Sequence, residues 1–91
     1  MKADPVQVNR LLKTARGQLD GILKMVEEDR YCMDISNQLL ATISILSRAN
    51  REVLRAHMEA CIRSAFEEGS EEDKTQKTQE ILTLLDKLAQ P

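Results

Sequence analysis

Apolar residues recur at spacings of three and four through the first third of the chain. The series consists of Val8, Leu12, Ala15, Leu19, Ile22 and Val26. This spacing is typical of an amphipathic helix that places its apolar residues on one face. Asp4 is a favourable N-cap, Pro5 suits the first helical position, and Gln7 stands where a capping box needs it. We therefore predict a helix over residues 5–28.

The second apolar pattern is longer and contains neither Gly nor Pro between residues 32 and 67. Its apolar positions are Ile35, Leu39, Ile43, Leu46, Val53, Leu54, Met58, Ile62 and Ala65. A single helix of this length measures about 50 Å, at 1.5 Å per residue. A small monomer cannot cover such a helix, so the pattern predicts a partner chain.

A third helix is predicted over residues 71–89. Gly69 ends the second helix, and Ser70 then precedes three acidic residues, which suit the positive end of a helix dipole. The apolar residues fall in the second half of this segment, at Ile81, Leu82, Leu84, Leu85 and Leu88. Since no strand pattern appears, we expect an all-α protomer of three helices in one domain, residues 1–91.

Composition limits the size of the core. Among 91 residues there are one Tyr, one Phe and no Trp. Small chains with thin cores often gain stability by forming oligomers. No long apolar run or signal-peptide pattern is present, so we expect no membrane span, a cytoplasmic location and reduced thiols.

The net charge of −2 argues against nucleic acid binding, but the charges are unevenly placed. Residues 1–66 hold ten Lys and Arg against eight Asp and Glu, whereas residues 67–91 hold three against seven. A local basic face is therefore compatible with the sequence, although charge alone favours a solvated surface of mixed sign. With one His and no nucleophile arranged beside an acid and a base, we expect no enzyme activity.

The candidate metal ligands are Cys32, His57 and Cys61, which are the only two cysteines and the only histidine of the sequence. His57 and Cys61 are four residues apart, so on a helix they share a face one turn apart. Two thiolates and one imidazole suit Cu(I) or zinc. Three protein ligands do not close a tetrahedral structural zinc site, so trigonal Cu(I) fits better. Taken singly, each residue is more often a small buried hydrophobe or a hydrogen-bonding side chain than a metal ligand.

Because of the position of Cys32, a metal site that includes Cys32, His57 and Cys61 must lie between two chains. Cys32 and Cys61 are 29 residues apart, which is roughly 40 Å along one helix. Metal–thiolate bonds are only about 2.3 Å long. If two copies of the long helix pack antiparallel, Cys32 of one chain lies beside His57 and Cys61 of the other. Two-fold symmetry then makes two identical sites.

Four segments resemble the copper-sensitive operon repressors, within a wider all-helical repressor family that includes nickel/cobalt, formaldehyde and persulfide sensors. The resemblance covers about Val8 to Leu88, and the segments are RGQLDGI (16–22), EEDRYCMDI (27–35), SRANR (47–51) and HMEAC (57–61). It implies a three-helix protomer, an antiparallel dimer with a four-helix-bundle core, and a dimer of dimers. It also implies an apoprotein that binds double-stranded operator DNA and is released by Cu(I) at Cys32, His57′ and Cys61′, where primes mark the second chain.

The resemblance implies two further sets of residues. Tyr31 and Glu80 would support the metal ligands, since Glu80-Ile81-Leu82 is similar to the family's third helix. Arg48 matches a basic position of the family, but Leu11 stands where many members carry Arg in the first helix. We expect mainly phosphate contacts, from these residues: Arg10, Lys13, Arg16, Arg48 and Arg51.

The sequence is compatible with several alternative functions. A persulfide sensor of the same family would link Cys32 to Cys61′ through sulfur and would use no metal and no His57. A nickel or cobalt sensor would want more imidazole than one His supplies. A formaldehyde sensor depends on a Pro at the extreme N-terminus, whereas Pro5 is typical of a helix start. A plain helical interaction module with incidental cysteines is the alternative outside the family.

Overall fold

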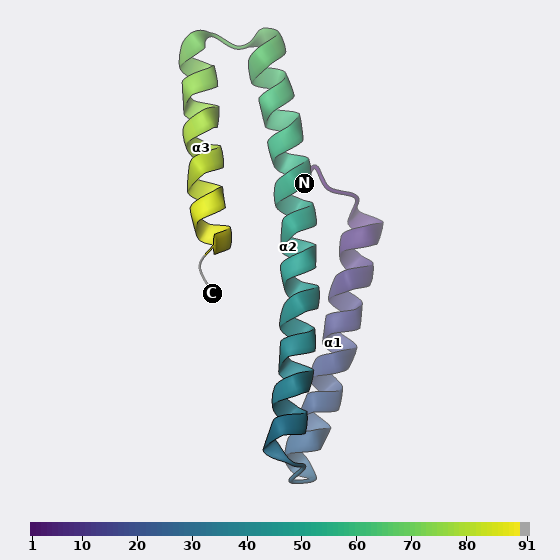
Figure 1. Ribbon diagram of the computed structural model, residues 1–91. Coiled ribbons are helices and arrows are strands. Elements are labelled where there is room, and N and C mark those ends of the chain that lie inside the picture. The colour runs from purple at the N-terminus through teal and green to yellow at the C-terminus, as the bar shows by residue number, and fades with distance from the viewer. Residues whose placement is uncertain (90–91) are drawn as a thin grey trace. The chain divides into compact units, whose positions relative to one another are not determined.

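The computed structural model describes residues 1–89, apart from the side chains of Glu68 and Ala89. In this range the chain forms three α-helices and no strand: α1 (Pro5–Glu27), α2 (Cys32–Glu68) and α3 (Glu71–Ala89) (Figure 1). The all-α, three-helix prediction is confirmed, and each helix boundary lies within one residue of the predicted one.

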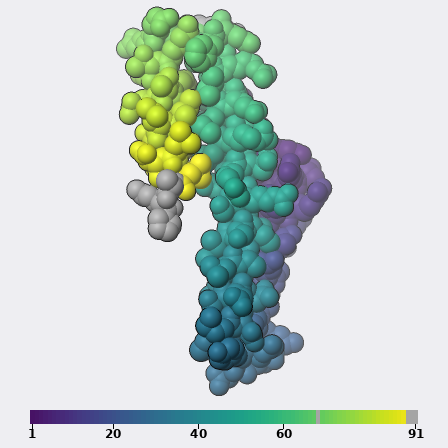
Figure 2. Space-filling view, viewed as in Figure 1, coloured from purple at the N-terminus to yellow at the C-terminus, as the bar shows by residue number. Residues whose placement is uncertain are grey.

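The helices form two compact units. The first, here called the N-terminal hairpin, comprises residues 4–52, with α1 antiparallel to the first part of α2. The second, here called the C-terminal hairpin, comprises residues 1–3 and the chain from Val53 onward. In it the second part of α2 runs antiparallel to α3 (Figures 1 and 2).

Buried residues of the N-terminal hairpin recur at intervals of seven. On α1 they are Val8, Ala15 and Ile22, and on α2 they are Thr42 and Ala49. Ala15, Thr42 and Ala49 are small, which lets the two helices approach closely. Thr42 is 3% exposed, and its hydroxyl has two acceptors within reach of its single proton, Gln18 Oε1 at 2.8 Å and the Gln38 carbonyl at 3.1 Å. A polar pair therefore fixes the register between α1 and α2.

A second apolar stripe on each helix of this hairpin stays exposed. On α1 it consists of Leu12, Leu19, Leu23 and Val26, and on α2 of Leu39, Ile43 and Leu46. Such a contiguous apolar surface on a small domain is typical of an interaction face. It is the surface on which the predicted partner chain would pack.

The turn between α1 and α2 needs one residue in the left-handed region. Asp29 has φ of 54° and follows the C-cap Glu28. The Arg30 N–H donates to the Met25 carbonyl at 3.0 Å, which is the Schellman pattern of a helix C-terminus. At the other end of α1, the Asp4 carboxylate accepts from the Val6 N–H at 3.0 Å, as expected for the N-cap.

The C-terminal hairpin turns through Gly69 and Ser70. The Gly69 N–H donates to the Ala65 carbonyl at 2.8 Å, and a Cβ at Gly69 would collide with that oxygen. Ser70 Oγ then accepts from the Asp73 N–H at 3.2 Å, while Asp73 Oδ2 accepts from the Ser70 N–H at 3.3 Å. This reciprocal capping box starts α3.

The first three residues belong to the C-terminal hairpin. Ala3 is only 5% exposed, although it lies next to the N-terminus. Its burial holds the short segment before α1 against residues of this unit. Among the described residues, no helix is long and apolar enough to span a bilayer.

Candidate metal centre

His57 and Cys61 lie one turn apart on α2, as their spacing predicts. The Cys61 sulfur is 3.5 Å from Nε2 and 3.8 Å from Nδ1 of His57. Both side chains are partly exposed, and the thiol is free. A continuous helix from Cys32 to Glu68 carries them, so their relative placement is set by backbone geometry.

Glu80 of α3 contacts the imidazole from the neighbouring helix. Its Oε1 lies 2.9 Å from His57 Nε2. An ionised carboxylate only accepts hydrogen bonds, so Nε2 must carry the proton in this pair. In the neutral ring the lone pair is then on Nδ1, 3.8 Å from the Cys61 sulfur. Glu80 therefore favours the tautomer of His57 that has its proton on Nε2. In this tautomer Nδ1 is free to bind a metal.

Two neighbouring side chains, His57 and Lys77, stabilise the ionised form of the Glu80 carboxylate. Lys77 Nζ lies 3.4 Å from Glu80 Oε2, on the same helix three residues earlier. The hydrogen bond from His57, followed by the hydrogen bond and charge of Lys77, lowers the pKa of Glu80 below 4.5. The carboxyl is therefore ionised at neutral pH, as the tautomer argument requires. Lys77 was not among the predicted site residues, although its spacing of three from Glu80 was a readable signal.

Cys32 begins α2, and Tyr31 directly precedes it. The Tyr31 carbonyl accepts from the N–H groups of Asp34 and Ile35. Both side chains are exposed, and both residues belong to the N-terminal hairpin. A single chain thus brings together His57, Cys61 and Glu80, while Cys32 and Tyr31 lie in its other unit.

The donors fit a soft metal ion in part. Two ligands bound at about 2.0 Å for nitrogen and 2.3 Å for sulfur, 109–120° apart, are roughly 3.5–3.7 Å from each other. In the tautomer set by Glu80 the free ring nitrogen is Nδ1, and its separation of 3.8 Å from the Cys61 sulfur lies close to this range. Among the side chains that the structure describes, no group of three or more His, Cys, Asp and Glu is arranged to hold a metal. The pair is therefore compatible with part of a metal site, which needs at least one further ligand.

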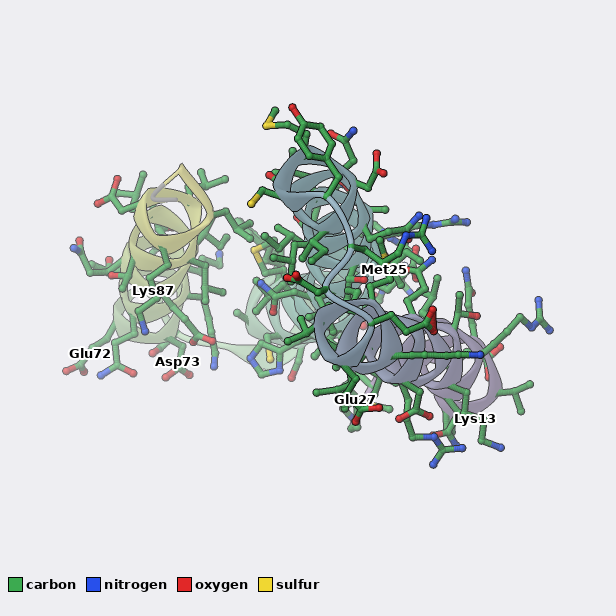
Figure 3. The ribbon with its side chains drawn as sticks, turned by 90° about the horizontal axis from the view of Figure 1, so that it is seen from below. Lys13, Met25, Glu27, Glu72, Asp73 and Lys87 are labelled. Atoms are coloured by element: carbon green, nitrogen blue, oxygen red, sulfur yellow. The ribbon has the colours of Figure 1, made fainter. Side chains whose placement is uncertain are left out.

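The five predicted DNA-contacting residues all belong to the N-terminal hairpin, and all are exposed: Arg10, Lys13, Arg16, Arg48 and Arg51. At 100° per residue, Arg10 and Lys13 lie within about 40° of the direction opposite the buried residue Ala15 on α1. Figure 3 shows Lys13 projecting from α1, with Glu27 further along the same helix. The outer face of α1 is therefore basic in its N-terminal half.

Comparison with known proteins identifies the family. The family model described as "metal-sensitive transcriptional repressor" matches residues 6–87. The copper-sensing transcriptional repressor CsoR of Mycobacterium ulcerans is 53% identical over 62 residues, which are 68% of this chain and 52% of that protein. CsoR of Bacillus subtilis is 35% identical over 81 residues, covering 89% and 77% of the two chains.

A solved structure has the same fold. The nickel-responsive transcriptional regulator InrS superposes with a TM-score of 0.81 at 28% sequence identity, covering 97% of this chain and 96% of that one. The chain spans about half the length of the mycobacterial relatives that it matches. The family resemblance of the sequence is confirmed by these matches. The chain belongs to the family of metal-sensitive transcriptional repressors.

Proposed function

We propose that this chain is a Cu(I)-responsive repressor of transcription. Its reduced apoprotein binds double-stranded operator DNA, and Cu(I) binding releases it. The observation that carries the proposal is the joint geometry of His57, Cys61 and Glu80: an imidazole held in one tautomer beside a thiol at ligand separation. Relatives whose names state that they sense copper support it. In this account the chain is a sensor and DNA-binding domain of three helices, with no enzyme activity.

The missing ligand is Cys32 of a second chain. Two copies of α2 packed antiparallel through the exposed stripe of Leu39, Ile43 and Leu46 would bury that stripe. The same packing brings the start of one α2 to the His57 and Cys61 end of the other, giving two equivalent sites. Tyr31, next to Cys32, would then lie at the same site. Two such dimers make the proposed homotetramer.

Copper is favoured over nickel by the donor set. Two thiolates and one imidazole form a soft, three-coordinate set that suits Cu(I). Nickel prefers additional imidazole or harder ligands, and His57 is the only histidine of the chain. The similarity to a nickel-responsive regulator therefore supports the fold and a metal-sensing function, but it does not support nickel as the metal that this chain senses.

The helices connect the proposed metal site to the residues proposed to contact DNA. Cys32 of one chain and His57 and Cys61 of the other would hold the metal, which when bound would supply an attraction between the two chains. His57 is bonded to Glu80, so a shift of the imidazole is passed to α3. Arg10, Lys13 and Arg48 supply phosphate contacts from the N-terminal hairpin, so the DNA affinity depends strongly on salt.

A persulfide sensor is the second candidate, and one observation favours it. Cys32 and Cys61 are both free thiols, and Cys32 is exposed. Sulfur links between Cys32 and Cys61′ would use the same interface but leave His57 and Glu80 without a role. The hydrogen bond between those two residues is why copper is placed first.

A mixing experiment tests the shared site. The Cys32→Ser and His57→Ala variants each lose Cu(I)-dependent release of DNA when alone. When they are mixed and allowed to exchange subunits, each mixed dimer regains one intact site, so part of the response returns. The matched control mixes His57→Ala with Cys61→Ser, which cannot rebuild a site. Absence of rescue in the first mixture, with exchange demonstrated, contradicts a site shared between chains.

A further inference from the structure

A pocket of about 450 Å³ opens beside Cys61 in the C-terminal hairpin. The first turns of α3, the end of α2 and the N-terminal segment form its walls. Small residues at the α2–α3 turn and on α2 leave the space open, and its polar lining consists of Lys2, Cys61, Ser64, Asp73 and Lys77. His57 is not among the residues that line it. This volume lies within the ordinary range for small-molecule sites.

The free charge in this pocket is positive. Asp73 already accepts the Ser70 N–H as part of the α3 capping box. Lys77 is paired with Glu80. Lys2 lines the pocket and is exposed, and no ion pair of Lys2 is found among the described residues. The ammonium group of Lys2 is thus the charge that a bound molecule would meet, and it favours an anion.

The thiol of Cys61 defines the chemistry of such an anion. A thiolate attacks one sulfur of a small disulfide, the S–S bond breaks, and the other half leaves as a thiolate. The protein gains a mixed disulfide, and no further oxidant is needed. A negatively charged group on the disulfide would be drawn to Lys2 while its sulfur reaches Cys61.

We propose that this pocket is a binding and modification site for small anionic disulfides, which it directs to Cys61 through Lys2. The pocket and its selectivity do not depend on copper. One consequence rests on the proposed function: a Cys61 held in a mixed disulfide cannot serve as a Cu(I) ligand, so the modified protein stays on DNA when copper is added.

The test measures the rate of Cys61 modification in a Cys32→Ser background, where Cys61 is the only thiol. The two probes are dianionic 5,5′-dithiobis(2-nitrobenzoate) and neutral 2,2′-dithiodipyridine. The quantity compared between variants is the second-order rate constant for the dianionic probe divided by that for the neutral probe. We expect Lys2→Gln to lower this ratio about threefold to tenfold at low salt, and Lys2→Glu to lower it further.

Lys87→Gln is the matched control, because Lys87 is exposed on α3 of the same hairpin but does not line the pocket. Its ratio should equal that of the parent. Equal ratios in Lys2→Gln and Lys87→Gln would overturn the proposal, as would a fall in both rate constants together that leaves the ratio unchanged. The assay contains neither copper nor DNA, so its failure is distinct from a failure of the proposed repressor function.

Discussion

Nε2 of His57 lies 2.9 Å from Oε1 of Glu80, so the only imidazole of the chain is bonded across from α2 to α3. The contact has two consequences for the proposed sensor. It fixes which ring nitrogen is free to bind a metal, and it ties the position of the ring to the third helix.

Replacing Glu80 with Ala should weaken Cu(I) binding without removing a ligand. The ring would lose the acceptor that holds its tautomer, and comparable outer contacts are worth about 10- to 100-fold in metal affinity. The measurement is a Cu(I) competition titration against a chelator of known affinity. Glu72→Ala is the control, since Glu72 is an exposed acid of the same helix. If the two variants bind Cu(I) equally well, Glu80 does not orient the ligand.

The same contact predicts a pH dependence of stability on the acid side. The pKa of Glu80 is lowered in the folded chain, first by the bond from His57 and then by Lys77. A carboxyl with a lowered pKa stabilises the fold above its unfolded pKa, and this contribution is lost as the pH falls through the lower, folded value. Urea unfolding of the parent should therefore lose stability below about pH 4.5, and Glu80→Gln should show a shallower decline there. Identical acid limbs would contradict the assignment.

The basic residues of the N-terminal hairpin predict the salt dependence of DNA binding. Arg48→Gln should weaken binding to all DNA sequences and reduce the slope of log K against log salt by about 0.9 for each phosphate that the variant no longer neutralises. Arg63→Gln is the matched control, because Arg63 is exposed but lies in the other unit. Fluorescence anisotropy at several salt concentrations measures both slopes. An unchanged slope for Arg48→Gln would remove this residue from the interface.

The left-handed conformation of Asp29 predicts an unusual ranking of two substitutions. The Asp29→Gly variant should have a free energy of unfolding about 1 kcal/mol higher than that of Asp29→Ala, because Ala meets a steric penalty at positive φ. Inside a helix the order is reversed, so the ranking reports the turn and not general propensity. Chemical denaturation of Asp29→Gly and Asp29→Ala provides the comparison. A more stable Ala variant would show that Asp29 leaves this conformation in solution.

The helices were predictable because their ends are encoded locally. Asp4 and Pro5 start α1, and Gly69 and Ser70 separate α2 from α3, each through interactions within a few residues. The closeness of His57 and Cys61 follows in the same way from a spacing of four on a helix.

Interactions between helices were less accessible to sequence reasoning. Glu80 was named through the family resemblance, since no spacing rule connects it to His57, 23 residues earlier. The register between α2 and α3 depends on side-chain packing and on the turn at Gly69. The sequence does not predict that Lys2 and Cys61 line one pocket either, because the two residues are 59 positions apart and no local pattern places the N-terminal segment against α2.

In the proposed function, Cu(I) bound through His57 controls DNA binding. The most direct measurement is a titration of reduced protein on DNA from upstream of its own coding sequence, run in parallel with Cu(I) and with an organic persulfide. We expect that Cu(I) releases the parent protein, that His57→Ala still binds DNA but loses most of this release, and that the persulfide does not change the affinity for DNA. Normal release of His57→Ala by Cu(I), or release of the parent by persulfide alone, would contradict the proposed function.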